Sequence, residues 1–254
     1  MLMMTNMSHA ASRNLKTKTS SDLGISLSSY NYEEPGYMSS EGAKVGLDLH
    51  VTDVTQDNNF IRFDLRYAFG SVDYSSPISG TANGEPDWYV ETRMLFGTDK
   101  STKNSVFSPY AGLGYRYLFN DARGVTSSGA SGYRRESNYV YLPVGVIHRT
   151  ALQDQSKLLS TLEFDLLLTG KQVSRLSDTG LLQDATNTQS SGYGLKLSVI
   201  YENENGAIGP YVNYWNIAQS NTVALYYPNG TLYGTGFEPK NNTIEFGLMA
   251  NQQF

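Results

Sequence analysis

Apolar residues recur at every second position through most of the chain. In the stretch IRFDLRYAFG, which begins at Ile61, the odd-numbered residues are all apolar, while Arg62, Asp64 and Arg66 take even-numbered positions. A period of two places successive side chains on opposite faces of a β-strand. Pro210 blurs the ninth segment and suggests a β-bulge there. We predict about ten strands, within the ranges 23–28, 44–51, 61–70, 88–97, 110–119, 139–149, 161–168, 193–202, 208–217 and 243–251.

The connections between these segments alternate in length. Every second connection is long, except that the first of this set, near 33–37, is brief. Short connections fall at 53–58, 97–105, 150–156 and 203–206, and longer ones, rich in Gly, Ser, Asn and Thr, at 70–86, 120–133, 170–191 and 218–241. Short turns at one end and long loops at the other are typical of a closed, up-and-down transmembrane β-barrel. With ten strands, both chain ends lie on the short-turn side.

Charged residues gather on the polar faces of the segments in equal numbers of each sign. This balance favours a closed lumen, because buried charges must be paired or they cost several kcal/mol each. The candidates for ion pairs in the lumen are Arg62, Asp64, Arg66, Glu91, Arg93, Arg116, Glu163, Asp165, Lys196 and Glu245. The remaining charged residues of the polar faces are Lys44, Asp48, Arg149 and Glu202.

The apolar faces carry Leu, Val, Phe, Tyr and Trp, as expected for a band that faces lipid. The alternative is a soluble sandwich or lipocalin-like barrel whose two faces are both covered by packed layers. No segment has the helical period that usually provides such a cover. The sequence therefore predicts an all-β chain folded as a single closed antiparallel transmembrane barrel.

Composition narrows the function classes. The chain of 254 residues is 39% hydrophobic and only 17% charged, with a net charge of −5. No basic run is present that would neutralise a nucleic-acid backbone. The sequence contains no cysteine, which excludes disulfides and thiol nucleophiles. A mean hydropathy of −0.38, and an uncharged stretch at 205–237 that is interrupted by Gly, Pro and Asn, argue against a spanning helix.

The N-terminal 21 residues are expected to lie outside the barrel. Ser8-His9-Ala10 resembles the end of a cleavable export signal, although no charged start or long apolar core precedes it. A disordered start is the alternative, and the polar segment 12–21 is predicted to be unstructured. The barrel domain is predicted to span 22–254.

The end of the chain resembles the C-terminal aromatic signature of bacterial outer-membrane proteins. Phe254 is the last residue, and Phe246 and Leu248 lie on the apolar face of the last segment, whereas Gln252 departs from the signature. The stretch PYAGLGYRY (109–117) is similar to strands of small OmpA-like β-barrels. This resemblance implies a Gram-negative outer membrane, periplasmic termini, and contacts with lipid, lipopolysaccharide and the barrel-assembly machinery.

The activity is less constrained than the fold. The omptin proteases are also ten-stranded barrels, and they use a histidine at the outer rim. His50 and His148 are predicted near the periplasmic end, away from that rim. We therefore expect a non-enzymatic barrel without metal or cofactor, whose lumen is filled by side chains and which acts structurally or through its loops.

Two alternatives stay open. One is a narrow pore for small solutes, and the weaker one is an outer-leaflet hydrolase of the omptin or lipid A-modifying type. The external ligand is not indicated by any motif. Arg134 and Arg135, at the external start of the sixth segment, are candidates for contacts with lipopolysaccharide phosphates.

Overall fold

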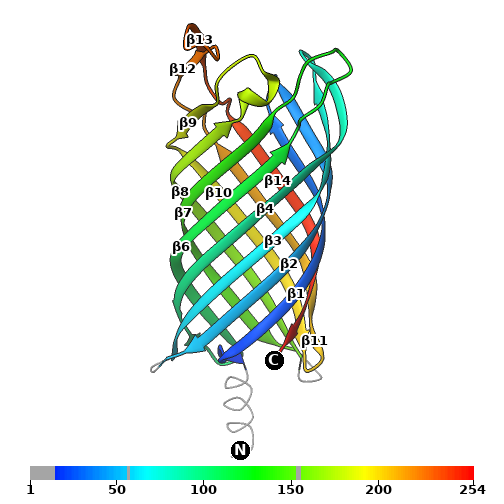
Figure 1. Cartoon of the computed structure of the whole chain (residues 1–254). Coiled ribbons are helices and arrows are strands. Elements are labelled where there is room, and N and C mark those ends of the chain that lie inside the picture. Colours follow the sequence, from blue (N-terminus) through cyan, green and yellow to red (C-terminus); the bar gives the residue numbers. More distant parts are fainter. Residues whose placement is uncertain (1–14, 56–57, 153–155) are drawn as a thin grey trace, which may run out of the picture.

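The computed structural model describes residues 15–55, 58–152 and 156–254. In this part of the chain, ten long strands form one closed antiparallel barrel, which confirms the predicted fold (Figure 1). The barrel strands are β1 (Ser20–Glu34), β2 (Met38–Val54), β3 (Asn59–Ser76), β4 (Gly80–Thr98), β6 (Ser105–Asp121), β7 (Arg134–Ala151), β8 (Lys157–Ser174), β10 (Gly192–Asn203), β11 (Gly206–Ile217) and β14 (Asn241–Gln253). The shorter elements are β5 (Lys100–Ser101), a 3-10 helix η3 (Leu176–Thr179), β9 (Ala185–Gln189), β12 (Val223–Tyr226) and β13 (Leu232–Gly236).

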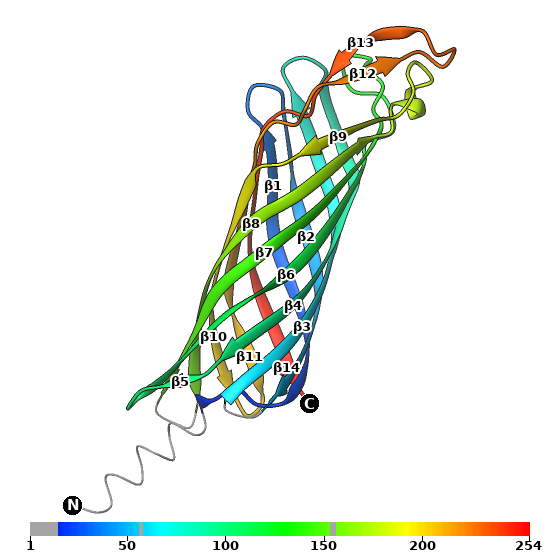
Figure 2. The same cartoon turned by 90° about the vertical axis from the view of Figure 1, so that its left-hand side faces the viewer.

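Each barrel strand pairs with its neighbours in chain order, and β14 closes the barrel on β1. The C-terminus and the start of β1 lie at the end that carries the short connections (Figure 1). We call this the turn end, and the opposite end the loop end. At the loop end, β12 and β13 form a separate hairpin that extends beyond the barrel wall (Figure 2).

The two faces of the barrel have opposite chemistry. Ile25, Leu113 and Phe246 point outward and are 62%, 55% and 56% exposed, whereas Lys44 and Glu163 point inward and are each 1% exposed. A soluble barrel requires the reverse arrangement, with its apolar side chains inside. The outward apolar band and the inward charges therefore match the predicted transmembrane barrel.

Aromatic rings line the edge of the apolar band nearest the loop end. Trp88 packs on Phe119 and Tyr117, with ring centroids 5.3 and 5.4 Å apart. Tyr67 packs on Phe69 in the same way at 5.3 Å. Such girdles are typical of barrels whose amphipathic rings lie at the lipid–water interface.

The strands continue past this band toward the loop end. β3 runs to Ser76 and β4 begins at Gly80, so most of the predicted long loop 70–86 is paired backbone. Above the band the outward residues become polar, as at Ser71 and Asp73. The loop end is therefore raised above the apolar surface on a polar extension of the barrel.

Four inward glycines make room for aromatic rings in the lumen. Each lies directly opposite an inward ring on the next strand, and a Cβ atom at any of them would come within 2.7 Å of that ring. Gly thus provides the space that lets a ring lie flat across the neighbouring strand. The pairs are Gly97 with Phe60, Gly114 with Tyr141, Gly145 with Tyr110, and Gly170 with Tyr139.

Two local predictions are wrong. The predicted bulge at Pro210 is absent, since β11 pairs with β14 and β10 in constant register; proline removes one N–H without adding a residue. A register shift instead occurs opposite Val140, where Leu168 and Thr169 both face outward. The segment 12–21 is structured from Leu15 onward, and β1 begins at Ser20. The expected export-signal remnant, residues 1–10, lies outside the described residues.

Candidate functional site

The lumen is crossed by side chains at several heights, beginning with a group around Arg66 on β3. Its guanidinium donates to both carboxylate oxygens of Asp48, at 2.8 and 3.0 Å, and to Glu245 on β14 at 2.7 Å. It also donates to the hydroxyls of Tyr89 and Tyr211, which in turn donate to Glu245. Strands β3, β4, β11 and β14 are thereby joined through the interior, and this part of the lumen is filled.

A second group links β4 to the opposite wall. Arg93 donates to Glu163 on β8 and to Asp64 on β3, both at 2.6 Å. Lys196 on β10 pairs with Glu91 on β4, and it lies 3.3 Å from Glu163 and 3.5 Å from Asp165. The structure thus brings acidic and basic candidates of the sequence together as cross-lumen ion pairs.

Arg116 is held mainly by aromatic rings. Its guanidinium carbon lies 4.4 Å from the ring centre of Tyr89 and 5.7 Å from that of Trp215, and its Nε is 4.0 Å from Glu91. Trp215 packs edge-on against Tyr141 at 5.0 Å. A cation between ring faces gains electrostatic attraction without a full hydrogen-bond shell. Rings and charges together therefore occupy the middle of the lumen.

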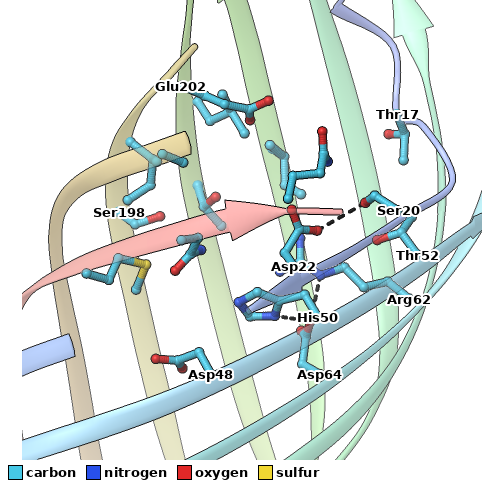
Figure 3. Close-up of a pocket in the computed structure, with 18 of the residues that line it drawn as sticks. Thr17, Ser20, Asp22, Asp48, His50, Thr52, Arg62, Asp64, Ser198 and Glu202 are labelled. Carbon is cyan, nitrogen blue, oxygen red and sulfur yellow. Dashed lines mark hydrogen bonds and ion pairs between the residues drawn. The ribbon is translucent and has the colours of Figure 1, made fainter. Parts of the chain in front are cut away.

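Below these layers, a cavity of about 500 Å³ opens at the turn end. Pairing of β1, β2, β3 and β4 puts Asp22, His50, Asp64 and Arg93 in one inward row. His50 Nδ1 and Arg62 Nε each lie 2.6 Å from the same oxygen of Asp64, as the dashed lines in Figure 3 mark. The carboxylate of Asp64 therefore serves three partners, His50, Arg62 and Arg93.

Neither described histidine lies at the loop end. His50 faces the turn-end cavity, and His148 faces outward near the same end, stacked on Phe107 at 4.4 Å. Within the described residues, no group of three or more His, Asp or Glu side chains could hold a metal ion.

The loop-end mouth is spanned by Arg135, which the sequence did not assign to the lumen. Its guanidinium pairs with Glu34 at the end of β1 and with Glu238 before β14, and it lies over the ring of Tyr32. Glu34 and Glu238 are both 5% exposed. Because adjacent strand residues face opposite sides, only Arg134 of the two arginines predicted to contact lipopolysaccharide faces outward, and Arg135 points into the mouth.

Arg134 does face outward, at the height of the polar extension. It donates to both carboxylate oxygens of Asp178 on η3, at 2.8 and 2.7 Å. These hydrogen bonds lower the pKa of Asp178 to about 2. Arg175 is similarly engaged with Glu136 and Asp184. The outer wall below the long loops therefore carries a row of charged groups.

The proposed assembly signal lies at the opposite end. Leu248 and Phe246 face outward on β14, and Phe254 follows the strand with 76% of its surface exposed. The backbone of Phe254 pairs with Ser21. The terminal ring is thus accessible to a partner.

The chain matches no protein-family model and no curated protein in sequence. Among solved structures, it is similar to the outer-membrane protease OmpT from Escherichia coli, with 11% identity and a TM-score of 0.60, over 95% of this chain and 100% of that one. The translocator domain of the autotransporter NalP from Neisseria meningitidis is another match, with 9% identity and a TM-score of 0.45, over 98% and 95% of the two chains. At such identities the likeness concerns the fold alone.

The protein thus has the fold of the Gram-negative outer-membrane β-barrels. The fold does not determine the activity, because one fold hosts many activities.

Proposed function

We propose that the protein is a non-enzymatic β-barrel of the Gram-negative outer membrane, closed by its own side chains, that acts structurally or through its surface loops. The ion pairs that cross the lumen carry this proposal. Arg66 reaches Glu245, and Lys196 reaches Glu91, between strands that are not neighbours. A barrel of about ten strands has little interior space beyond that needed by its side chains.

The proposed orientation has the turn end and both termini in the periplasm and the loop end outside. The exposed ring of Phe254 then faces the compartment in which the barrel-assembly machinery receives the chain. Arg134 and the neighbouring Arg175 and Lys171 would meet lipopolysaccharide phosphates at the outer edge of the band.

The loop end offers the surface for interaction. The β12–β13 hairpin and its flanks carry no charge from Asn205 to Phe237. Tyr227 packs edge-on against Tyr233, and both are largely exposed. Exposed tyrosines and amides suit recognition of uncharged partners, since the rings offer apolar contact and the polar tips offer hydrogen bonds.

Conductance in planar lipid bilayers tests the proposal against the narrow-pore alternative. The wild-type barrel is expected to give no steady current. The variant Arg66→Ser, Arg93→Ser, Lys196→Ser, which removes three cross-lumen cations, is expected to give one. A steady wild-type current would establish a pore. Different migration of unboiled and boiled protein on a detergent gel first verifies that each sample is a folded barrel.

An activity screen on peptides and lipid A addresses the hydrolase alternative. No turnover is expected, because His50 and His148 lie at the turn end. Turnover that disappears on replacing His50 or His148 would overturn the non-enzymatic proposal.

A further inference from the structure

Two carboxyl groups share one arginine at the loop-end mouth. Arg135 is the second residue of β7, and around the barrel this strand lies opposite β1, which carries Glu34. The third member, Glu238, belongs to the segment between β13 and β14. One guanidinium nitrogen of Arg135 donates to both carboxyl groups, so Glu34 and Glu238 lie side by side on one cation. Two buried carboxyl groups that share a site disfavour simultaneous ionisation, because their like charges repel.

Glu238 lies at the base of the loop that carries the β12–β13 hairpin. Its backbone exchanges hydrogen bonds with Ser220, so the two legs of the loop are tied together. The outgoing leg is held on β9 by neutral hydrogen bonds, such as Asn187 to the carbonyl of Asn221. The ion pair with Arg135 ties the returning leg to the barrel wall.

Acidic groups outnumber basic ones around this contact. With both glutamates ionised, the trio carries a net charge of −1, and it is buried. Tyr32 on β1 donates to Glu34, and Tyr133 and Tyr139 lie beside the trio as neutral groups. Glu85 on β4 is a further acidic group that interacts with Arg135, and Lys44 on β2 is paired with Asp87. Among the described residues, Arg135 is the one basic group that forms an ion pair with Glu34 or Glu238.

We propose that Glu34, Arg135 and Glu238 form a pH-sensitive latch, which holds the loop 218–240 and its hairpin on the mouth when one carboxyl group is protonated and releases it when both are ionised. The latch would regulate the loop-end interaction surface that carries the β12–β13 hairpin, and its biological role rests on the proposed function of that surface. Its operation is a property of the loop and is measurable without any partner.

The direction of the response follows from proton linkage. Burial raises the pKa of Glu238 to about 7; Arg135 opposes this rise and Glu34 adds to it. An exposed glutamate in a released loop titrates near 4.3. The latched form therefore binds a proton that the released form loses, so the latch is strongest below about pH 4.3 and weakens as the pH rises through 7. Each unit by which the pKa of Glu238 in the latched loop exceeds its pKa in the released loop changes the latch equilibrium about tenfold.

The absence of cysteine allows a direct measurement of loop position. Spin labels are attached at Asn229→Cys, in the hairpin, and at Ser39→Cys, at the start of β2. Pulsed electron–electron double resonance then measures the distance between the two labels. We expect a single narrow distribution at pH 5.5 and a broad, longer one at pH 8.5. An unchanged distribution over this range would overturn the proposal.

Variants separate the latch from general loop motion. Glu238→Gln keeps an acceptor for Arg135 and a donor for Glu34 without a charge, so the narrow distribution should persist at pH 8.5. Glu34→Gln should act in the same way. The matched control Glu33→Gln removes a neighbouring carboxylate that faces outward, and it should retain the wild-type response. A wild-type response in both Glu238→Gln and Glu34→Gln would also refute the latch, whatever the conductance experiment shows.

Discussion

Replacement of Arg66 by alanine tests whether the cross-lumen ion pairs stabilise the barrel. The change removes five hydrogen bonds, to Asp48, Glu245, Tyr89 and Tyr211. It leaves the carboxylates of Asp48 and Glu245 without their cation at 5% and 1% exposure. Removal of one partner from a buried ion pair costs about 3–5 kcal/mol. We expect Arg66→Ala to lose that much free energy of unfolding.

Arg62→Ala is the matched control on the same face of the same strand. Arg62 makes one ion-pair contact, with Asp64, which keeps Arg93 and His50 as partners. The side chain of Arg62 is also 24% exposed. Its loss should therefore cost less than about 1 kcal/mol.

Urea unfolding in lipid vesicles, followed by tryptophan fluorescence, measures both variants. Arg66→Ala combined with Glu245→Gln should recover part of the loss, because one uncompensated charge is removed. If Arg66→Ala is no more destabilising than Arg62→Ala, the paired charges of the lumen do not stabilise the barrel.

Three further predictions concern packing, lipid contact and assembly. Gly114→Ala places a Cβ atom 2.2 Å from a buried ring and should cost about 1–3 kcal/mol in the same urea assay, whereas Gly234→Ala meets nothing within 4 Å and should change little. Leu113→Arg, in the middle of the outward band, should lower the free energy of unfolding by about 2–4 kcal/mol. Ser71→Arg, on the polar extension, should lower it by less than about 1 kcal/mol. Equal losses in the two variants would contradict the placement of the band. Deletion of Phe254 should slow machinery-assisted insertion into vesicles, timed by the appearance of the heat-modifiable form, without lowering the urea midpoint of the folded barrel; an unchanged insertion rate would argue against the assembly signal.

The alternation of side chains predicted the two faces of the barrel, because strand geometry alone fixes it. The partners inside the lumen were not predictable in this way. Lys196 and Glu91 are 105 residues apart, and no local rule relates them. Arg134 and Arg135 were both named as candidates for lipopolysaccharide contact, although the same alternation, applied to this pair, places only one of them outside.

The limits of the strands were predicted less well than their faces. Beyond the apolar band both faces become polar, so the hydrophobic contrast disappears while backbone pairing continues, as in the hairpin between β3 and β4. The structured segment after Leu15 was missed for a related reason. It is held by polar contacts, such as Thr17 to Asp99 at 2.6 and 2.8 Å, which leave no apolar pattern.

The long sequence separation of the lumen contacts has a kinetic consequence. Arg66 and Glu245 are 179 residues apart, and Glu245 lies on the last strand. Their pairing must await the arrival of β14, so the charges keep their hydration shells until the cylinder closes. Opening the seam between β1 and β14 reverses that step and exposes many charges to water together. We therefore expect opening of this seam to be a costly step in unfolding, on which the lifetime of the folded protein depends.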